Sequence, residues 1–306
     1  MAIIEARGLT RAYGALTAVE ALDLDVREGS VTGFLGRNGA GKTTTIRMLL
    51  GLVHPTAGTV RVCGQAVTSG HAAPPYQVAA IIEGPAFYGA LSATENLRVL
   101  TETAGLRVTA SAIEAMLERV GLGARGAEPV RGFSLGMKQR LGVASVLIHS
   151  PKVLFLDEPT NGLDPQGQAD MRALLASLPA EGRTVFVSSH ALRDVEQMCT
   201  DLVIIDQGRK VAEGRVHDLL QQRARLSLRV SDVAAARGVL QRALPEVAFL
   251  EGEPHSVHLK PAGDADALAA AAVRALIQAN LEVYAVASHT AELERYFLEL
   301  TGPGQS

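Results

Sequence analysis

One stretch limits what this chain can fold into more than any other: the nine residues Gly36–Thr44, which read Gly-Arg-Asn-Gly-Ala-Gly-Lys-Thr-Thr. They match G-x-x-x-x-G-K-[ST], the pattern of phosphate-binding loops, or P-loops. The apolar residues Val31–Leu35 before the loop predict a buried strand. Thr45–Leu50 after it predict a helix that ends at Gly51. Strand, glycine loop and helix in this order predict an α/β nucleotide-binding fold.

Each part of the loop has an expected role. The glycines let the backbone curl so that successive N–H groups face a phosphate, and the helix N-terminus adds partial positive charge. Lys42 supplies charge for the β- and γ-phosphates, and the Thr43 hydroxyl is a ligand for Mg²⁺. A glycine-rich turn before an ordinary helix is the alternative, which the flanking strand and helix disfavour. The predicted nucleotide contacts are Gly36, Arg37, Asn38, Gly39, Ala40, Gly41, Lys42, Thr43 and Thr44.

Composition narrows the class of protein. A chain of 306 residues with 47% hydrophobic residues can form one large domain or two smaller ones. The net charge of −3 gives no reason to expect a nucleic acid or another polyanion as partner. The two cysteines, Cys63 and Cys199, are too few for a disulfide framework, which favours a reducing compartment.

We expect no membrane span and no secretory signal. Ile3–Arg7 carries charge where a signal peptide would be apolar. The longest run without Asp, Glu, Lys or Arg is Val62–Ile82, and it contains prolines and glycines. Any role at a membrane is therefore expected to depend on a partner.

Alternating residues at the N-terminus predict a small antiparallel sheet. Leu22–Val26 has the two-residue period of a half-buried strand, and Ile3–Arg7 and Thr59–Val62 are expected beside it. Arg11–Gly14 is predicted as the loop between the first two strands. There, Tyr13 could stack on adenine or pack on the sheet as a surface tyrosine, and spacing alone leaves both interpretations open.

Two further predicted strands end in residues suited to phosphate chemistry. Val153–Asp157 is an apolar strand whose last residue, Asp157, is followed by Glu158. Ligands of doubly wound sheets bind beyond the carboxyl ends of the strands. Asp157 is therefore predicted to hold Mg²⁺ and Glu158 to accept a proton from attacking water, against the alternative of two solvated carboxylates. Thr184–Ser188 is a third such strand, and His190 follows it.

The middle of the chain predicts helices. The buried strand Val78–Ile82 is followed by Glu83, and residues 92–122 read as amphipathic helices. Phe133–Arg140 begins a further helix, for which Ser134 is the expected N-cap.

From Arg215 the pattern changes. Between Leu226 and Val286 the predicted order is strand, helix, strand, strand, helix, strand, with a hairpin turn at Gly252–Pro254. This is the order of a ferredoxin-like module, and a final helix is predicted over Ala291–Leu300. The predicted domains are residues 1–215, with a helical subdomain at about 84–150, and residues 216–306, an accessory domain without a catalytic constellation.

With these motifs in place, residues 1–215 resemble the ATP-binding cassette (ABC) ATPases. Gly36–Thr43 correspond to the Walker A motif and Val153–Asp157 to Walker B. Phe133–Gln139 stand at the family's signature, usually LSGGQ. Its third position is Leu135 rather than glycine, while Ser134 and Gly136 are retained. The resemblance implies a RecA-like P-loop core with an antiparallel β subdomain and a helical subdomain, followed here by the small α+β module.

The resemblance also implies roles for single residues. Two cassettes pair head to tail, so Ser134 and Gly136 of the signature would meet ATP held by a second chain. The sequence Asn161–Asp164 looks like the D-loop, whose Asp164 would couple the two sites. Glu158 would be the catalytic glutamate, His190 the switch histidine at the γ-phosphate, and Tyr13 the adenine-stacking residue.

One position departs from the family in a way that bears on the metal. Glu83 stands where the family has the glutamine of the Q-loop. A carboxylate can also bind Mg²⁺, so Glu83 is predicted as a metal ligand beside Thr43 and Asp157. The alternative is that Glu83 contacts only the permease, the separate transmembrane protein with which cassettes of this family assemble.

The signature with Leu135 and the stretch Glu83–Tyr88 look like the bacitracin, lantibiotic and drug-exporter type of ABC-2 systems. The implied function is ATP hydrolysis that powers efflux of a drug- or antibiotic-like substrate through a separate transmembrane permease. The implied location is the cytoplasmic face of the cell membrane, with a second copy or a paralogue as the paired cassette. A soluble ATP-gated resistance or binding protein without transport is the alternative.

Overall fold

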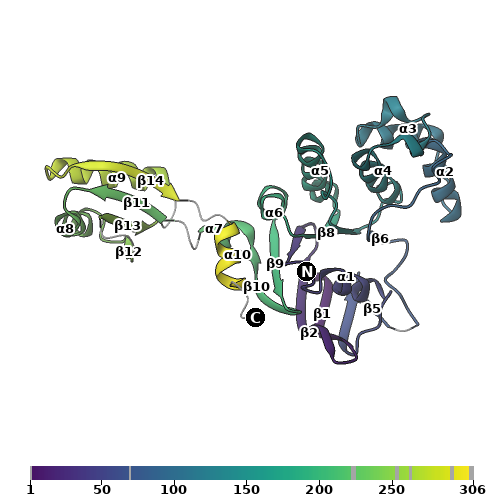
Figure 1. The fold of residues 1–306 in the computed structure, drawn as a ribbon, viewed down its shortest axis with the longest axis horizontal. Coiled ribbons are helices and arrows are strands. Elements are labelled where there is room, and N and C mark those ends of the chain that lie inside the picture. The colour runs from purple at the N-terminus through teal and green to yellow at the C-terminus, as the bar shows by residue number, and fades with distance from the viewer. Residues whose placement is uncertain are drawn as a thin grey trace. The chain divides into compact units, whose positions relative to one another are not determined.

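The computed structural model describes residues 2–68, 70–221, 225–251, 255–261, 264–289 and 293–302. The chain divides into two compact units, Met1–Gly214 and Arg215–Ser306 (Figure 1). Each unit has a hydrophobic core of its own. The two are therefore described one at a time.

A six-stranded sheet forms the centre of the first unit, in the order β10-β9-β3-β8-β7-β6. The register is parallel where β3 pairs with β8 and β9, and where β7 pairs with β6 and β8. Every residue of β3 and β8 is buried, as expected of parallel strands covered on both faces. These strands confirm the predicted α/β core; their bounds are β3 Val31–Leu35, β6 Val78–Ile81, β7 Val153–Asp157, β8 Thr184–Ser189, β9 Asp201–Asp206 and β10 Arg209–Arg215.

The N-terminal sheet is antiparallel, as predicted, with strand order β2-β1-β4-β5. The prediction of a loop over Arg11–Gly14 is wrong: the first strand continues to Tyr13, which pairs with Leu16. Register shifts along β1 let both strands run on to a tight turn at Gly14. The bounds are β1 Ala2–Tyr13, β2 Leu16–Arg27, β4 Ala57–Val62 and β5 Gln65–Val67.

One hydrophobic core joins the two sheets to helix α1, Lys42–Leu50, which follows the P-loop. Phe186 lies at its centre, with ring centroids 5.2 Å from Phe34 and 5.6 Å from Phe155. Each ring comes from a different strand, so the contacts fasten β3, β8 and β7 together. The three strands that lead to the predicted site residues are thus held together by the packing of these phenylalanine rings.

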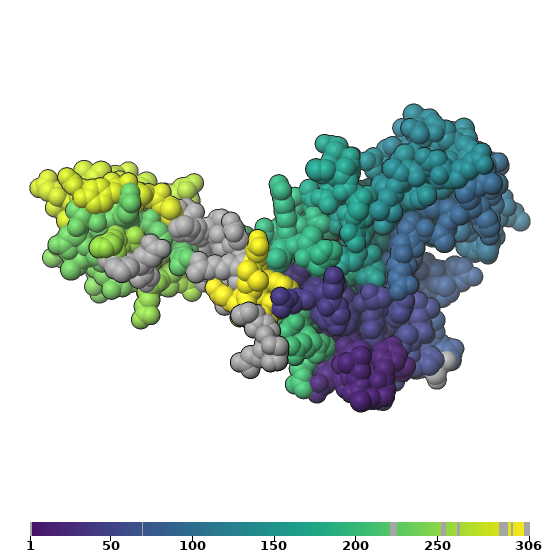
Figure 2. Space-filling model, in the orientation of Figure 1, coloured from purple at the N-terminus to yellow at the C-terminus, as the bar shows by residue number. Residues whose placement is uncertain are grey.

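A separate core holds the predicted helical region, which projects as a lobe from the rest of the first unit (Figure 2). Ser92 caps its first helix in a capping box with Glu95, and Ser134 caps α4 by accepting a hydrogen bond from the Met137 N–H. Its helices are α2 Ala93–Thr103, α3 Ala110–Arg119 and α4 Leu135–Leu147, with 3₁₀ turns at Gly123–Arg125 and Val130–Gly132. Three further helical segments connect strands of the central sheet. Between β7 and β8 these are α5 Pro165–Ser177 and a 3₁₀ turn at Leu178–Glu181, and between β8 and β9 it is α6 Leu192–Met198.

The second unit has the predicted ferredoxin-like order of elements. Its antiparallel sheet runs β12-β13-β11-β14 and buries Leu226, Leu228 and Val230 against α8 and α9. The predicted turn at Gly252–Pro254 and the predicted helix start at Ala291 lie outside the described residues. The bounds are α7 Val216–Gln221, β11 Arg225–Val230, α8 Val233–Ala243, β12 Ala248–Leu250, β13 Ser256–Lys260, α9 Ala265–Gln278, β14 Val283–His289 and α10 Leu293–Thr301.

Across the part of the chain that the structure describes, every helix is too short or too polar to cross a membrane.

Candidate active site

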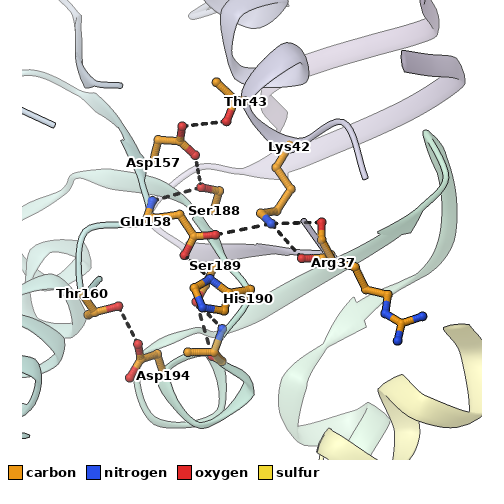
Figure 3. Close-up of polar contacts among 12 residues, drawn as sticks. Arg37, Lys42, Thr43, Asp157, Glu158, Thr160, Ser188, Ser189, His190 and Asp194 are labelled. Carbon is orange, nitrogen blue, oxygen red and sulfur yellow. Dashed lines mark hydrogen bonds and ion pairs between the residues drawn. The ribbon is translucent and has the colours of Figure 1, made fainter. Parts of the chain in front are cut away.

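The carboxyl ends of three neighbouring strands meet at one edge of the central sheet. Leu35 on β3 pairs with Ser189 on β8, and Asp157 on β7 pairs with Ser188 on β8. The P-loop leaves β3 at this edge, and Glu158 and His190 follow β7 and β8. Three segments that are far apart in the sequence are therefore brought into one cluster of polar side chains (Figure 3).

The P-loop positions Lys42 at the start of α1. Gly41 precedes it with φ of 101°, and a Cβ on Gly41 would lie only 2.5 Å from the carbonyl oxygen of Ala18, so only glycine fits. The Lys42 side chain is 7% exposed. Its Nζ donates hydrogen bonds to the carbonyl oxygens of Gly36, at 2.8 Å, and Arg37, at 3.3 Å. The ammonium is therefore anchored on the loop that precedes it.

Thr43 and Asp157 place two oxygen atoms side by side. The Thr43 hydroxyl donates to Oδ2 of Asp157 at 2.8 Å. Nowhere among the described residues do three or more His, Cys, Asp or Glu side chains form a cluster that could hold a metal ion. Hard oxygen donors in small number fit Mg²⁺, which usually takes one or two protein ligands and completes its shell with water and phosphate.

Glu158 links Lys42 to His190. Its Oε1 lies 3.4 Å from Nζ of Lys42 and its Oε2 lies 2.8 Å from Nδ1 of His190. The Glu158 side chain is 21% exposed, so water can reach it. Its φ of 51° is in the left-handed region, which a non-glycine residue adopts only where the surroundings hold it there. A partly exposed carboxylate fixed between two nitrogen groups is suited to accept a proton.

Ser188 is a site residue that the sequence reasoning missed. Its hydroxyl donates to Oδ1 of Asp157 and accepts the Glu158 N–H at 3.1 Å. The available signal is a serine that directly follows the apolar run Val185–Val187 on a strand that is buried throughout, where aliphatic residues are favoured.

A second missed cluster lies behind the site. Asp194 on α6 is 3% exposed and accepts from the Thr160 hydroxyl and from Nη1 of Arg172, both at 2.6 Å. Both carboxylate oxygens are satisfied, as a buried charge requires. The cluster ties the segment after Glu158 to α5 and α6, and no local pattern in the sequence indicates it.

The predicted signature and D-loop residues make their polar contacts within their own helices rather than with Lys42. Ser134 caps α4, and Asp164 caps α5 by accepting from the Gly167 N–H at 2.9 Å. Leu135 is 56% exposed and leans on Gly162, where an added Cβ would collide with its Cδ2 atom. Gly136 also lies near the D-loop, since a Cβ there would be 3.3 Å from the Cδ2 atom of Leu163. The two motifs are thus in contact inside one chain.

Glu83 is not brought to Thr43 and Asp157 in this structure. Its Oε1 lies 2.6 Å from Nη2 of Arg47, which is in the last turn of α1, and the Glu83 side chain is 67% exposed. Its φ of 60° is again left-handed. The role of Glu83 as a metal ligand stays a prediction, and Arg47 is a partner that the sequence did not suggest.

Tyr13 ends β1 with 45% of its surface exposed. The guanidinium carbon of Arg11 lies 4.4 Å from the centroid of its ring, a cation–π contact. One nitrogen of the same guanidinium, Nη1, donates to the carbonyl oxygen of His54 at 2.8 Å. The stacking of Tyr13 on adenine also stays a prediction.

Comparison with known proteins gives the family of the chain. Residues 19–161 match the protein family described as ABC transporter. The bacitracin transport ATP-binding protein BcrA of Bacillus licheniformis is 38% identical over 310 residues, covering 99% of this chain and 98% of that protein. The Nod factor export ATP-binding protein I of Ralstonia nicotianae is 40% identical over 223 residues, covering 71% of this chain and 68% of that protein. A solved ATP-binding subunit of an ABC transporter superposes with a TM-score of 0.63 at 30% identity, covering 72% of this chain and 92% of that one.

Proposed function

The chain belongs to the ATP-binding subunits of ABC transporters, which hydrolyse ATP to drive transport, and we propose that Lys42, Glu158 and His190 carry its catalysis. The observation that supports this assignment is the set of contacts in which Glu158 joins the other two side chains. Lys42, Glu158 and His190 follow the carboxyl ends of β3, β7 and β8 respectively, and doubly wound folds bind their ligands at these strand ends.

In the proposed reaction, Lys42 binds the β- and γ-phosphates through its ammonium. A carboxylate oxygen of Glu158 takes a proton from the attacking water, which makes the water a better nucleophile. The water oxygen bonds to the γ-phosphorus as the bond from that phosphorus to the bridging oxygen breaks, which leaves ADP and a phosphate that carries the water oxygen. His190, hydrogen-bonded to Glu158 through Nδ1, orients that carboxylate and faces the developing charge with the rest of its ring.

The residues that would hold Mg²⁺ are Thr43 and Asp157, whose oxygens are already hydrogen-bonded to each other. Bound Mg²⁺ neutralises charge on the phosphates. Glu83 is the third proposed ligand, and to reach the metal it has to release Arg47.

The cargo and partners follow from the relatives, which are named for bacitracin transport and Nod factor export. We infer that this chain powers export of an antibiotic-like substrate through a separate permease, from the cytoplasmic face of the membrane. Two cassettes, either two copies or one copy and a paralogue, would pair head to tail, with Ser134 and Gly136 facing the P-loop of the other chain and Asp164 coupling the sites. Within this assembly, residues 1–215 would hydrolyse ATP and residues 216–306 would serve assembly or partner choice.

The test is to express the chain together with any multi-span membrane protein encoded beside its gene, and to measure where the chain fractionates and whether cells export bacitracin. The expected result is membrane association and efflux that Glu158→Gln abolishes. Recovery only in the soluble fraction, with ATP binding but no efflux, would favour the alternative of an ATP-gated binding protein.

A further inference from the structure

Ser188 is a polar residue at a position where the fold favours an apolar one. It lies on β8, between β3 and β7, and none of its surface is exposed. The residues before it on the strand, Val185–Val187, are apolar and equally buried. A buried hydroxyl is unfavourable unless it is hydrogen-bonded, so its partners indicate its role.

Two consecutive acidic residues share this hydroxyl (Figure 3). It donates its one proton to Oδ1 of Asp157 and accepts the N–H of Glu158 at 3.1 Å. The carbonyl oxygen of Ser188 accepts the same N–H at 3.2 Å. Ser188 therefore contacts the side chain of one acid and the backbone of the next.

The first contact fixes the Asp157 carboxylate. Thr43 donates to its Oδ2 and Ser188 to its Oδ1, so both oxygens are held and the group cannot rotate about its Cβ–Cγ bond without breaking a hydrogen bond. Without the Ser188 hydroxyl, only the Thr43 contact would orient the carboxylate.

The second contact fixes the backbone at Glu158. The φ of 51° is unfavourable for a glutamate, and the Ser188 oxygens hold the N–H of that residue in place. This backbone conformation directs the Glu158 carboxylate so that Oε2 meets His190 and Oε1 lies near Lys42.

We propose that Ser188 is a positioning residue for ATP hydrolysis, which acts by holding Asp157 and Glu158 in one geometry. The proposal rests on the roles proposed above for those two acids. Side chains that are hydrogen-bonded to metal ligands, as Ser188 is to Asp157, commonly contribute about 10–100-fold to metal affinity or activity.

The test compares Ser188→Ala with Ser189→Ala in the full chain. Ser189 is a matched control because it is the next residue, is equally buried, and its hydroxyl accepts the Ala191 N–H at 2.9 Å rather than contacting an acid. Ser188→Ala should lower kcat by about 10–100-fold. The KM for ATP should change by less than about threefold, because the phosphate-binding loop is untouched.

A second measurement needs no ATP and no metal. Hydrogen–deuterium exchange at the Glu158 amide should be faster in Ser188→Ala than in the unmodified chain, because the amide loses one acceptor, whereas Ser189→Ala should leave it unchanged. If Ser188→Ala does not fold, Ser188→Cys keeps a side chain of similar size with a weak donor and should show the same loss of kcat and the same faster exchange.

The double variant Ser188→Ala with Glu158→Gln separates positioning from general destabilisation. The part of the effect that Ser188 exerts through Glu158 should be absent in the double variant, which should therefore lose less activity than the product of the two single effects, whereas independent effects would multiply. Equal kcat and equal exchange in the Ser188 and Ser189 variants would overturn the proposal. Wild-type turnover in Glu158→Gln would instead overturn the proposed role of Glu158, and the exchange result would still decide whether Ser188 holds its backbone.

Discussion

The Nδ1 atom of His190 lies 2.8 Å from Oε2 of Glu158, and the two residues follow adjacent parallel strands. The distance is short enough for a hydrogen bond between the imidazole and the carboxylate. The same carboxylate reaches toward Lys42 with its other oxygen, at 3.4 Å. A movement of either strand end would therefore change the position of the proposed base relative to the P-loop.

Glu158→Gln should keep the shape of the site but remove the base. We expect ATP hydrolysis to fall by about 10²–10⁴-fold, and ATP to remain bound long enough for a dimer to accumulate. Size-exclusion chromatography with Mg-ATP measures the dimer, and phosphate release measures turnover. Near wild-type turnover would remove Glu158 from its proposed role.

Lys42→Ala should weaken ATP binding by roughly 100-fold or more, because the phosphates lose the ammonium that the loop anchors. Calorimetry measures the affinity. Lys152→Ala, which removes an exposed lysine outside the site, is the control and should bind ATP normally. Equal affinity in both variants would contradict the assignment of the P-loop.

The Glu83 carboxylate should make ATP binding depend more steeply on Mg²⁺ than in Glu83→Gln, because a charged oxygen binds the metal more strongly and repels phosphate when the metal is absent. Titrating Mg²⁺ at fixed ATP measures this, and Glu83→Gln should remain an active ATPase. Arg47→Ala should enhance the difference by releasing Glu83, while its effect on stability should stay below about 1 kcal/mol since the ion pair is exposed. Superimposable titrations would leave Glu83 as a contact to the permease.

Gly162→Ala should destabilise the first unit by about 1–3 kcal/mol, because φ is 73° there and the new methyl meets Leu135. Adding Leu135→Ala should recover the part caused by the collision but not the part caused by the backbone. Urea unfolding of both single variants and the double variant measures the coupling. Strictly additive changes in the free energy of unfolding would show that the two side chains do not interact.

A chain that ends at Arg215 should still bind ATP, since the proposed phosphate contacts all precede that residue. Fluorescent ATP titration of the shortened protein measures this, with circular dichroism to establish that it is folded. Folded protein without ATP binding would contradict the proposed division of labour between residues 1–215 and 216–306.

The sequence was sufficient to predict the local parts of this site. The hydrophobic run that ends at Asp157 and the one that ends just before His190 are both visible in the local sequence. Because parallel strands have their carboxyl ends at the same edge of a sheet, these two residues are expected to lie close together. The same reasoning predicted the helix after the P-loop and its end at Gly51, whose backbone is left-handed as a C-cap requires.

What the sequence could not predict depends on which distant segments become neighbours. Ser188 contacts Asp157 only because β8 lies beside β7 in this register, and Arg47 pairs with Glu83 across a fold that no local period encodes. The sequence predicts a loop at Tyr13 because the register shifts that lengthen β1 interrupt its alternation of buried and exposed residues. Each case is a tertiary constraint that overrides a local pattern.

The strand order also has a consequence for synthesis on the ribosome. Both neighbours of β3 are made much later than β3 itself, since Val31 pairs with Val185 and Thr32 with Asp201. At ~5–20 residues per second, the strand that carries the P-loop waits roughly eight to thirty seconds for its first partner. During that time its backbone N–H and C=O groups can pair with other chains. We expect this interval to be the point at which the nascent chain is most exposed to aggregation and most dependent on chaperones.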